Sequence, residues 1–154
     1  MIFSDPNQLN QVSGRLIALD VGTKRIGIAI CDETRLIATP KLILYRQSNQ
    51  KDFDKIKNLI AENRIVGIVI GWPLTMDGKT QPMSQFVQKF AKNLDEFLEE
   101  KLPIILFEER LTSFEARQIN ASPLSRKTDR HKKNKFVDDI AASLILQHFL
   151  QSRN

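Results

Sequence analysis

The chain of 154 residues is predicted to fold as one α/β domain around a five-stranded mixed sheet flanked by helices. Three observations predict this class: short apolar runs of strand length, segments with a helical period, and their order along the chain. Three strands come first, and helices then alternate with strands. We therefore expect an antiparallel three-strand meander followed by parallel strands, because a helix between two strands is a crossover onto a parallel neighbour.

The first predicted strand ends in a carboxylate. Four apolar residues precede Asp20, the pattern of a strand buried on both faces of a sheet. Ligands of open α/β sheets gather outside the strand ends, which makes Asp20 a candidate site residue. Asp and Gly also favour turns, so an ordinary hairpin turn explains Asp20 equally well on these residues alone.

The later elements follow from hydrophobic periodicity. Apolar residues at helical spacing predict helices, and short apolar runs between them predict strands. The further elements expected are strands at 26–31, 36–45, 65–70 and 104–107 and helices at 52–62, 82–101, 112–120 and 136–150. Pro40 indicates that the third strand lies at an edge or a bend. Trp72, in the loop after the fourth strand, either stacks on a base or packs against the core.

Acidic residues also stand at the end of the last strand and the start of the last helix. Alternation along that strand does not decide between Glu108 and Glu109, because both of its faces look buried. Asp138 shares its helical face with Ala141 and Ile145, so we expect it to point inward beneath the sheet. The alternative for Asp138 is a simple electrostatic role at the first turn of the helix.

A basic segment stands out against a neutral body. The net charge is +5, from 23 Lys and Arg against 18 Asp and Glu. Residues 126–135 hold six cations and one acid, a balance of 6 − 1 = +5, so the remaining residues sum to zero. We expect this segment, in a mobile loop over about 121–135, either to bind a polyanion or to be a solvated loop. Its cations are Arg126, Lys127, Arg130, Lys132, Lys133 and Lys135.

Composition argues against several classes of protein. The single cysteine, Cys31, cannot form an internal disulfide and does not suggest a zinc cluster. Residues 1–14 show no signal peptide, and no apolar run approaches the ~20 residues of a membrane span. We expect a cytoplasmic protein, a monomer or a homodimer, with its domain over residues 15–150 and residues 1–14 as an N-terminal extension without an assigned role.

Four motifs, in this order, resemble those of the YqgF family, also called RuvX, of the ribonuclease H-like superfamily. They are Leu19–Gly27, Gly71–Gly78, Glu109–Ser113 with Ala116, and Val137–Asp138 followed by Ala141–Ala142 and Ile145–Leu146. The family is described as pre-16S ribosomal RNA nucleases and, earlier, as Holliday junction resolvases. The resemblance covers about residues 15–150. Glu108 departs from it, where the family usually has Asp, and so does Trp72, where an aliphatic residue is more usual.

The resemblance implies a ribonuclease H-like fold and a nuclease with three acidic positions, Asp20, Glu109 and Asp138, and it selects Glu109 over Glu108. Converging carboxylates repel one another, and oxygen ligands without His or Cys favour Mg²⁺ or Mn²⁺. Two such ions activate water and stabilise the leaving oxygen of a phosphodiester. We therefore predict a metal-dependent nuclease of structured nucleic acid. Its first candidate substrate is the 5′ end of pre-16S ribosomal RNA, and its second is the Holliday junction.

Basic residues adjoin two of these acids in sequence. Lys24, Arg25 and Arg110 are expected either to hold phosphates or to form ordinary surface ion pairs. Two other functions compete with the nuclease. Asp20–Thr23 also resembles the phosphate-binding turn of actin-like ATPases, but those enzymes close two lobes over the nucleotide and this chain has the length of one. A non-catalytic RNA-binding factor is the other, and three mutually repelling acids argue against it.

Overall fold

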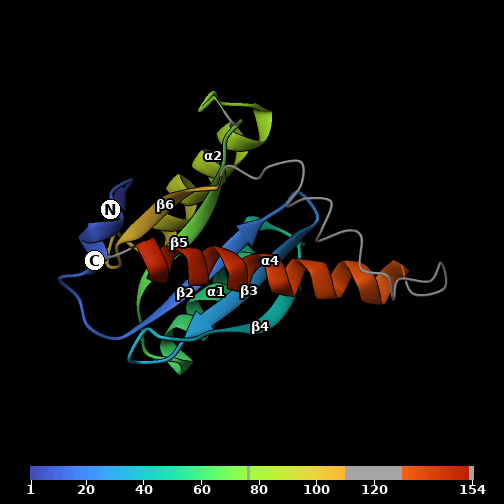
Figure 1. Cartoon of the computed structure of the whole chain (residues 1–154). Helices are drawn as coiled ribbons and strands as arrows, with labels where there is room; N and C mark the ends of the chain where they lie inside the picture. The colour runs from blue at the N-terminus through green and yellow to red at the C-terminus, as the bar shows by residue number, and fades with distance from the viewer. Residues whose placement is uncertain (76, 110–129, 153–154) are drawn as a thin grey trace.

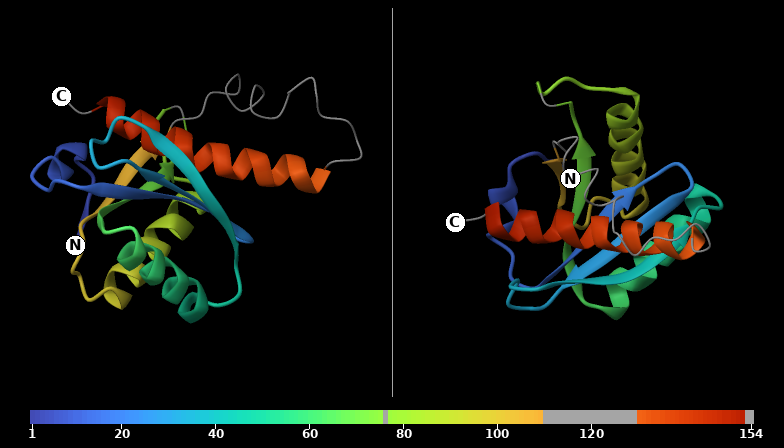
Figure 2. Two further views of the ribbon diagram at one scale, coloured as in Figure 1. Left: turned by 90° about the horizontal axis from the view of Figure 1, so that it is seen from below. Right: turned by 45° about the vertical axis from the view of Figure 1, so that its right-hand side comes forward.

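The computed structural model describes residues 1–75, 77–109 and 130–152, and for residues 130–139 the course of the backbone alone. A sheet lies between two helical layers, with α1 and α2 on one face and α4 on the other (Figures 1 and 2). The elements are β1 (Ile2–Phe3), the 3₁₀ helix η1 (Pro6–Leu9), β2 (Arg15–Val21), β3 (Arg25–Cys31), β4 (Ala38–Tyr45), α1 (Asn49–Glu62), β5 (Ile65–Pro73), α2 (Pro82–Phe97), β6 (Ile104–Glu109) and α4 (Arg130–Ser152).

The sheet has the strand order β1-β6-β5-β2-β3-β4. Strands β2, β3 and β4 form the predicted antiparallel meander, and β2, β5 and β6 run parallel. The predicted fold class is confirmed. β4 lies at the edge, as Pro40 indicated, and the register of its pairing with β3 shifts beside that proline, between Ile28 and Ala29.

The described sheet has six strands, so the predicted count of five was wrong. The additional strand is β1, which pairs in parallel with β6 through Ile2 and Ile104. A strand of two residues is too short to show any alternation, which is why periodicity missed it. Leu9 of the segment that follows is completely buried, and the Arg35 side chain donates hydrogen bonds to the Leu9 and Gly14 carbonyls at 2.8 and 2.7 Å.

Alternation along the strands divides the core into two clusters. On β2, Ile17, Leu19 and Val21 pack toward α1 and α2, whereas Leu16 and Ala18 pack toward α4. The buried residues of β5 and β6 are divided between the two faces in the same way, and helices cover both faces of these strands. This double cover explains the continuous apolar runs in the sequence.

The last helix begins at Arg130, six residues before the predicted start at Phe136. Residues 130–135 are basic and polar on every side, so they carry no apolar period, but Arg and Lys are good helix formers. The first turns of α4 project beyond the sheet (Figures 1 and 2). The predicted helix at 112–120 and the part of the expected mobile loop at 121–129 lie outside the described residues. No helix in the described part of the chain is long and apolar enough to cross a membrane.

Candidate active site

A cavity of about 140 Å³ lies under α4 at one edge of the sheet. Strands β2, β5 and β6 are neighbours and run parallel, so their carboxyl ends meet at this edge. The cavity is lined from the sheet by Asp20, Val21, Gly71, Pro73 and Glu109, and from the helix by Ala141, Leu144, Ile145 and His148. The fold thus brings together two of the three predicted acids, Asp20 and Glu109.

Strand alternation places both carboxylates on the α4 face. Asp20 follows Leu16 and Ala18 at a spacing of two, and Glu109 follows Ile105 and Phe107 in the same way. Glu108 lies on the other side of its strand and is exposed. Glu109, which the resemblance had selected and alternation in the sequence alone had left open, is therefore the acid on the α4 face.

Gly71 brings the helix close to the sheet at the cavity. A Cβ atom at this position would lie 2.6 Å from the Cδ1 atom of Ile145, far inside van der Waals contact. Glycine thus allows α4 to cross directly over β5, between the strands that carry the two carboxylates. The walls of the cavity depend on this close approach.

His148 contacts Glu109 across the cavity. The imidazole Nδ1 atom lies 3.4 Å from Oε1 of Glu109, whose side chain is 14% exposed, while that of His148 is 48% exposed. His148 was not predicted as a site residue, because it falls late in the helix and far from the acidic motifs along the chain. Its spacing is the available signal: it follows Ala141 by seven residues and Ile145 by three, and so shares their helical face.

The backbone of α4 carries Asp138 one turn before Ala141. At helical spacing, position 138 belongs to the stripe of Ala141 and Ile145, which line the cavity. Its side chain lies outside the described part of the chain, so its role as the third acid stays a prediction. Among the residues whose side chains are described, no three His, Cys, Asp or Glu come together in a group able to hold a metal ion.

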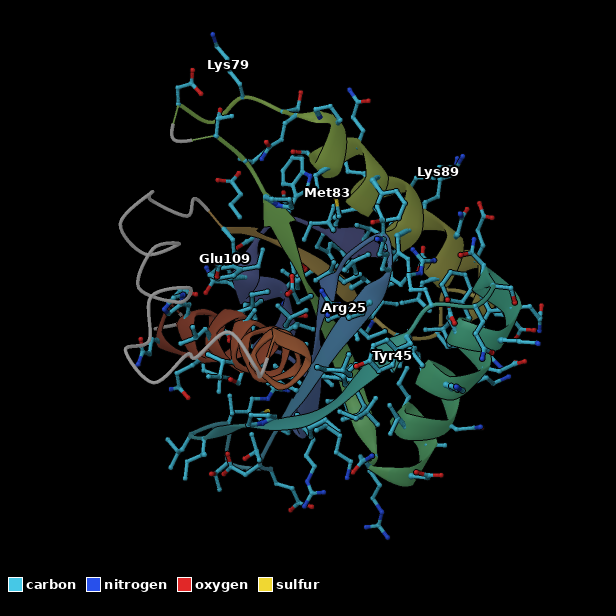
Figure 3. The ribbon with its side chains drawn as sticks, turned by 90° about the vertical axis from the view of Figure 1, so that its right-hand side faces the viewer. Arg25, Tyr45, Lys79, Met83, Lys89 and Glu109 are labelled. Atoms are coloured by element: carbon cyan, nitrogen blue, oxygen red, sulfur yellow. The ribbon has the colours of Figure 1, made fainter. Side chains whose placement is uncertain are left out.

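The turn between β2 and β3 forms a second hollow beside Asp20. This hollow, about 220 Å³ in volume, is lined by Asp20, Gly22, Thr23, Lys24 and Arg25. The Gly22 amide donates a hydrogen bond to the Arg25 carbonyl at 2.8 Å, and a Cβ atom on Gly22 would lie 2.8 Å from that same oxygen. The turn therefore requires glycine. Figure 3 shows Arg25 at the start of β3 and Glu109 at the end of β6.

The other predicted residues divide between two outcomes. Trp72 packs against the core and donates its indole N–H to the Ser84 carbonyl at 3.2 Å, which confirms the packing interpretation. Residues predicted to bind nucleic acid lie partly outside the described residues. These are Arg110, Arg126 and Lys127, and, with only the backbone in the projecting turns of α4 described, Arg130, Lys132, Lys133 and Lys135.

The mixed sheet, its two helical layers and the carboxylates at its edge define a protein of the ribonuclease H-like class. Among solved structures, the fowlpox virus Holliday junction resolvase is similar over 90% of this chain and 99% of its own, with a TM-score of 0.53 and 16% identity. The same viral resolvase with substrate Holliday junction DNA matches over 90% of this chain and 97% of its own, with a TM-score of 0.50 and 12% identity. At sequence identities this low, the comparison shows that the two proteins share a fold.

The family model described as "RuvX: Holliday junction resolvase" matches residues 14–152, and the chain belongs to this family. A protein of Thermoanaerobacter pseudethanolicus is 41% identical over 141 residues, 90% of this chain and 97% of the relative. A protein of Crocosphaera subtropica is 44% identical over 137 residues, 89% and 92% of the two chains. Both are named "Putative pre-16S rRNA nuclease". By family, the chain is a nuclease, a hydrolase of phosphodiester bonds.

Proposed function

We propose that this nuclease is metal-dependent and that it processes the 5′ end of pre-16S ribosomal RNA. The observation that carries the proposal is that Asp20 and Glu109, which are 89 positions apart in the sequence, line one cavity at the carboxyl ends of parallel strands. Carboxylates that share a site repel one another when both are ionised, and a cation bound between them relieves that repulsion.

The donor set fits a hard divalent cation. Asp20 and Glu109 offer carboxylate oxygens, the ligands that Mg²⁺ and Mn²⁺ prefer, and Asp138 on α4 is the proposed third ligand. We propose that Asp20, Glu109 and Asp138 would together hold two such ions. Bound metal of this kind activates a water molecule and stabilises the leaving oxygen of a phosphodiester.

The chain's own residues hold and orient the substrate. Lys24 and Arg25, in the hollow beside Asp20, are placed to bind phosphates that flank the bond to be cut. Arg110 directly follows Glu109 in sequence and is proposed for the same task. The basic segment over residues 126–135 is proposed to supply affinity that does not depend on sequence.

The names of the relatives support the pre-16S precursor as substrate. With such a substrate, we propose a cytoplasmic location. The description of the family model favours a second candidate, the Holliday junction. The same metal chemistry serves both, because each requires hydrolysis of a phosphodiester in a structured nucleic acid.

The test is to incubate purified protein with Mn²⁺ or Mg²⁺ and either a pre-16S precursor fragment or a four-way DNA junction, side by side. We expect cleavage of the RNA, and a loss of about 100-fold or more in Asp20→Asn and Asp138→Asn, because several kcal/mol of charge stabilisation depend on the metal. Variants as fast as the wild type would contradict the mechanism. Cleavage of the junction alone would favour the second candidate, and binding without cleavage would indicate a non-catalytic factor.

The basic segment has a separate test in the salt dependence of binding. If its six cations all neutralise phosphates on duplex RNA, replacing them with Ser should reduce the slope of log K against log salt by about 5. Binding is measured by fluorescence anisotropy in EDTA, so that no cleavage occurs. The control is the pair Lys89→Ser and Lys92→Ser, which should leave the slope unchanged. Both residues are exposed on α2, and Figure 3 labels Lys89. An unchanged slope in the six-residue variant would exclude this role.

A further inference from the structure

Arg46, the residue after β4, connects the end of that strand with three other parts of the molecule. Its side chain is 14% exposed and lies where the β2–β3 turn, α1 and α2 approach one another. No motif of the sequence drew attention to it. The contacts of this one residue fall into two sets, one toward the turn that lines the hollow beside Asp20 and one toward the helical layer.

The first set reaches the turn. The Arg46 backbone amide donates a hydrogen bond to the Lys24 carbonyl at 2.9 Å, and its Nη1 atom lies 3.5 Å from the Gly22 carbonyl oxygen, a weaker contact. These two carbonyls flank Thr23, the residue at the centre of the turn. The backbone of Arg46 thus contacts the turn on one side of its tip, and the side chain contacts it on the other.

The second set reaches α1. Nε of Arg46 pairs with Oδ2 of Asp52 at 3.3 Å, and Nη2 donates a hydrogen bond to Oδ1 of Asn49 at 2.8 Å. Asp52 is only 1% exposed and also accepts a hydrogen bond from the Gln47 amide at 3.1 Å. The Arg46–Asp52 pair is therefore both charged and buried, a combination that is stable only when its geometry is well satisfied.

Aromatic rings of α2 complete the surroundings of the guanidinium. Its Cζ atom lies 5.2 Å from the centre of the Phe90 ring and 5.6 Å from that of Phe86, within the range of cation–π attraction. Only arginine offers a flat cation that stacks on rings while its separate N–H groups reach three different acceptors. Lysine has a single ammonium group and cannot reproduce this arrangement.

We propose that Arg46 is a positioning residue for nucleic-acid binding. It anchors the turn of Gly22–Arg25 to the helical layer, so that Lys24 and Arg25 meet backbone phosphates at a constant place beside Asp20. Arg46 itself does not touch the substrate. This inference rests on the proposed binding role of the turn, and it adds the residue that holds that turn in place. A stiff turn avoids the loss of affinity that ordering a mobile turn on binding would cause.

A direct test measures hydrogen exchange of single amides by NMR in the wild type, Arg46→Lys and Arg46→Met. We expect the Gly22 amide, which is bonded within the turn, to exchange about tenfold faster or more in both variants, because local opening becomes easier. The Ala18 amide, at the centre of the sheet, serves as the control. Its exchange rate should change only as far as the free energy of unfolding of the whole protein changes. A parallel change at Gly22 and Ala18 would indicate general destabilisation and overturn the proposal.

A double-mutant cycle tests the functional side. The dissociation constant of a short RNA duplex is measured in EDTA for the wild type, Arg46→Met, Lys24→Ser with Arg25→Ser, and the combination. If Arg46 acts through the turn, Arg46→Met should weaken binding about fivefold in the wild type and less than about twofold in the background without the turn's cations. Equal effects in both backgrounds, or none in either, would overturn the proposal.

The two proposals can fail separately. Neither the exchange rates nor the binding cycle depends on metal or cleavage, so a protein that cuts no substrate can still confirm the role of Arg46. The converse result is cleavage that requires Asp20 together with a double-mutant cycle that shows no coupling between Arg46 and the turn. That result would retain the proposed nuclease mechanism and reject the positioning role of Arg46. Each measurement is made well below the melting temperature of every variant, so that all molecules compared are folded.

Discussion

Two sets of carboxylates lie near the same edge of the sheet, on opposite faces, and their surroundings differ. On the α4 face, Asp20 and Glu109 are partly exposed and line a cavity that opens to solvent. On the α1 and α2 face, Asp52 is 1% exposed and is held by the Arg46 guanidinium and a backbone amide. The chain supplies the buried acid with its counter-charge, whereas the cavity leaves room for a cation from solution.

This difference separates structural from functional carboxylates. A buried acid with a built-in partner stabilises the fold, and removing either member leaves an uncompensated charge. Acids that line an open cavity can also meet ligands from outside, whatever contacts they make within the protein. The contrast predicts opposite consequences for substitutions on the two faces.

The largest expected effect is on cleavage, at adjacent positions of β6. Glu109→Gln should lose about 100-fold or more in rate, because it removes a proposed metal ligand, whereas Glu108→Gln should stay within about twofold. The pair is a matched control, since the two residues are neighbours that lie on opposite sides of one strand. The measurement is the initial rate of cleavage, with Mn²⁺, of the substrate that the wild type cuts. Equal losses in the two variants would contradict the placement of Glu109, and not Glu108, at the cavity.

The next effect is on stability. Asp52→Asn should lower the free energy of unfolding by about 3 kcal/mol, because the largely buried Arg46 would keep its charge without the carboxylate that pairs with it. Asp20→Asn should lower it less, because Asp20 is only partly buried and lies at an open cavity. Urea unfolding followed by circular dichroism measures both. Asp54→Asn, an exposed acid on the same helix, is the control, and a larger loss in Asp20→Asn than in Asp52→Asn would reverse the comparison.

A smaller effect concerns the wall of the cavity. Gly71→Ala would place a methyl group against Ile145, and such overpacking should cost about 1–3 kcal/mol of unfolding free energy. Adding Ile145→Val removes the atom that the new methyl meets, so the double variant should recover part of the loss. Urea unfolding of the three variants checks this, and an additive loss in the double variant would contradict the close approach of α4.

The smallest effect concerns an exposed acid in the β3–β4 turn. Hydrogen bonds from the Thr34 hydroxyl and the Ile37 and Leu36 amides lower the pKa of Asp32 to about 2. Because the folded pKa lies below the unfolded one, its contribution is present above about pH 4 and is lost as the pH falls toward 2. Asp32→Asn should therefore reduce the dependence of the melting temperature on pH between 4 and 2. An identical dependence in wild type and variant would show that this acid contributes nothing.

Much of the fold follows from local patterns. The meander, the alternation of helices with parallel strands and the edge position of β4 were predicted from apolar periods and from Pro40, because these signals arise within single elements. The short strand β1 was not, since two residues carry no period. The early start of α4 was missed for a related reason: a helix that projects into solvent needs no apolar face.

The candidate site was predictable in part. Asp20 and Glu109 were identified as the ends of buried strands, with Glu109 chosen by family resemblance, and the structure places both in one cavity. His148 and Arg46 were not identified. Each depends on partners far away along the chain, Glu109 for His148 and Asp52 with the turn for Arg46, and no local pattern reports such a meeting. The role of Asp138 as the third acid stays a prediction, because its side chain lies outside the described part of the chain.

The sequence by itself determined the class of fold, the order of its elements and the family, because hydrophobic period and motif order are properties of short stretches. Only the tertiary structure decided which face each carboxylate occupies and which charges find partners inside the protein. Asp20 and Asp52 are the same kind of residue in the sequence. Packing of two helical layers on opposite faces of the sheet gives one of them an arginine and leaves the other at an open cavity.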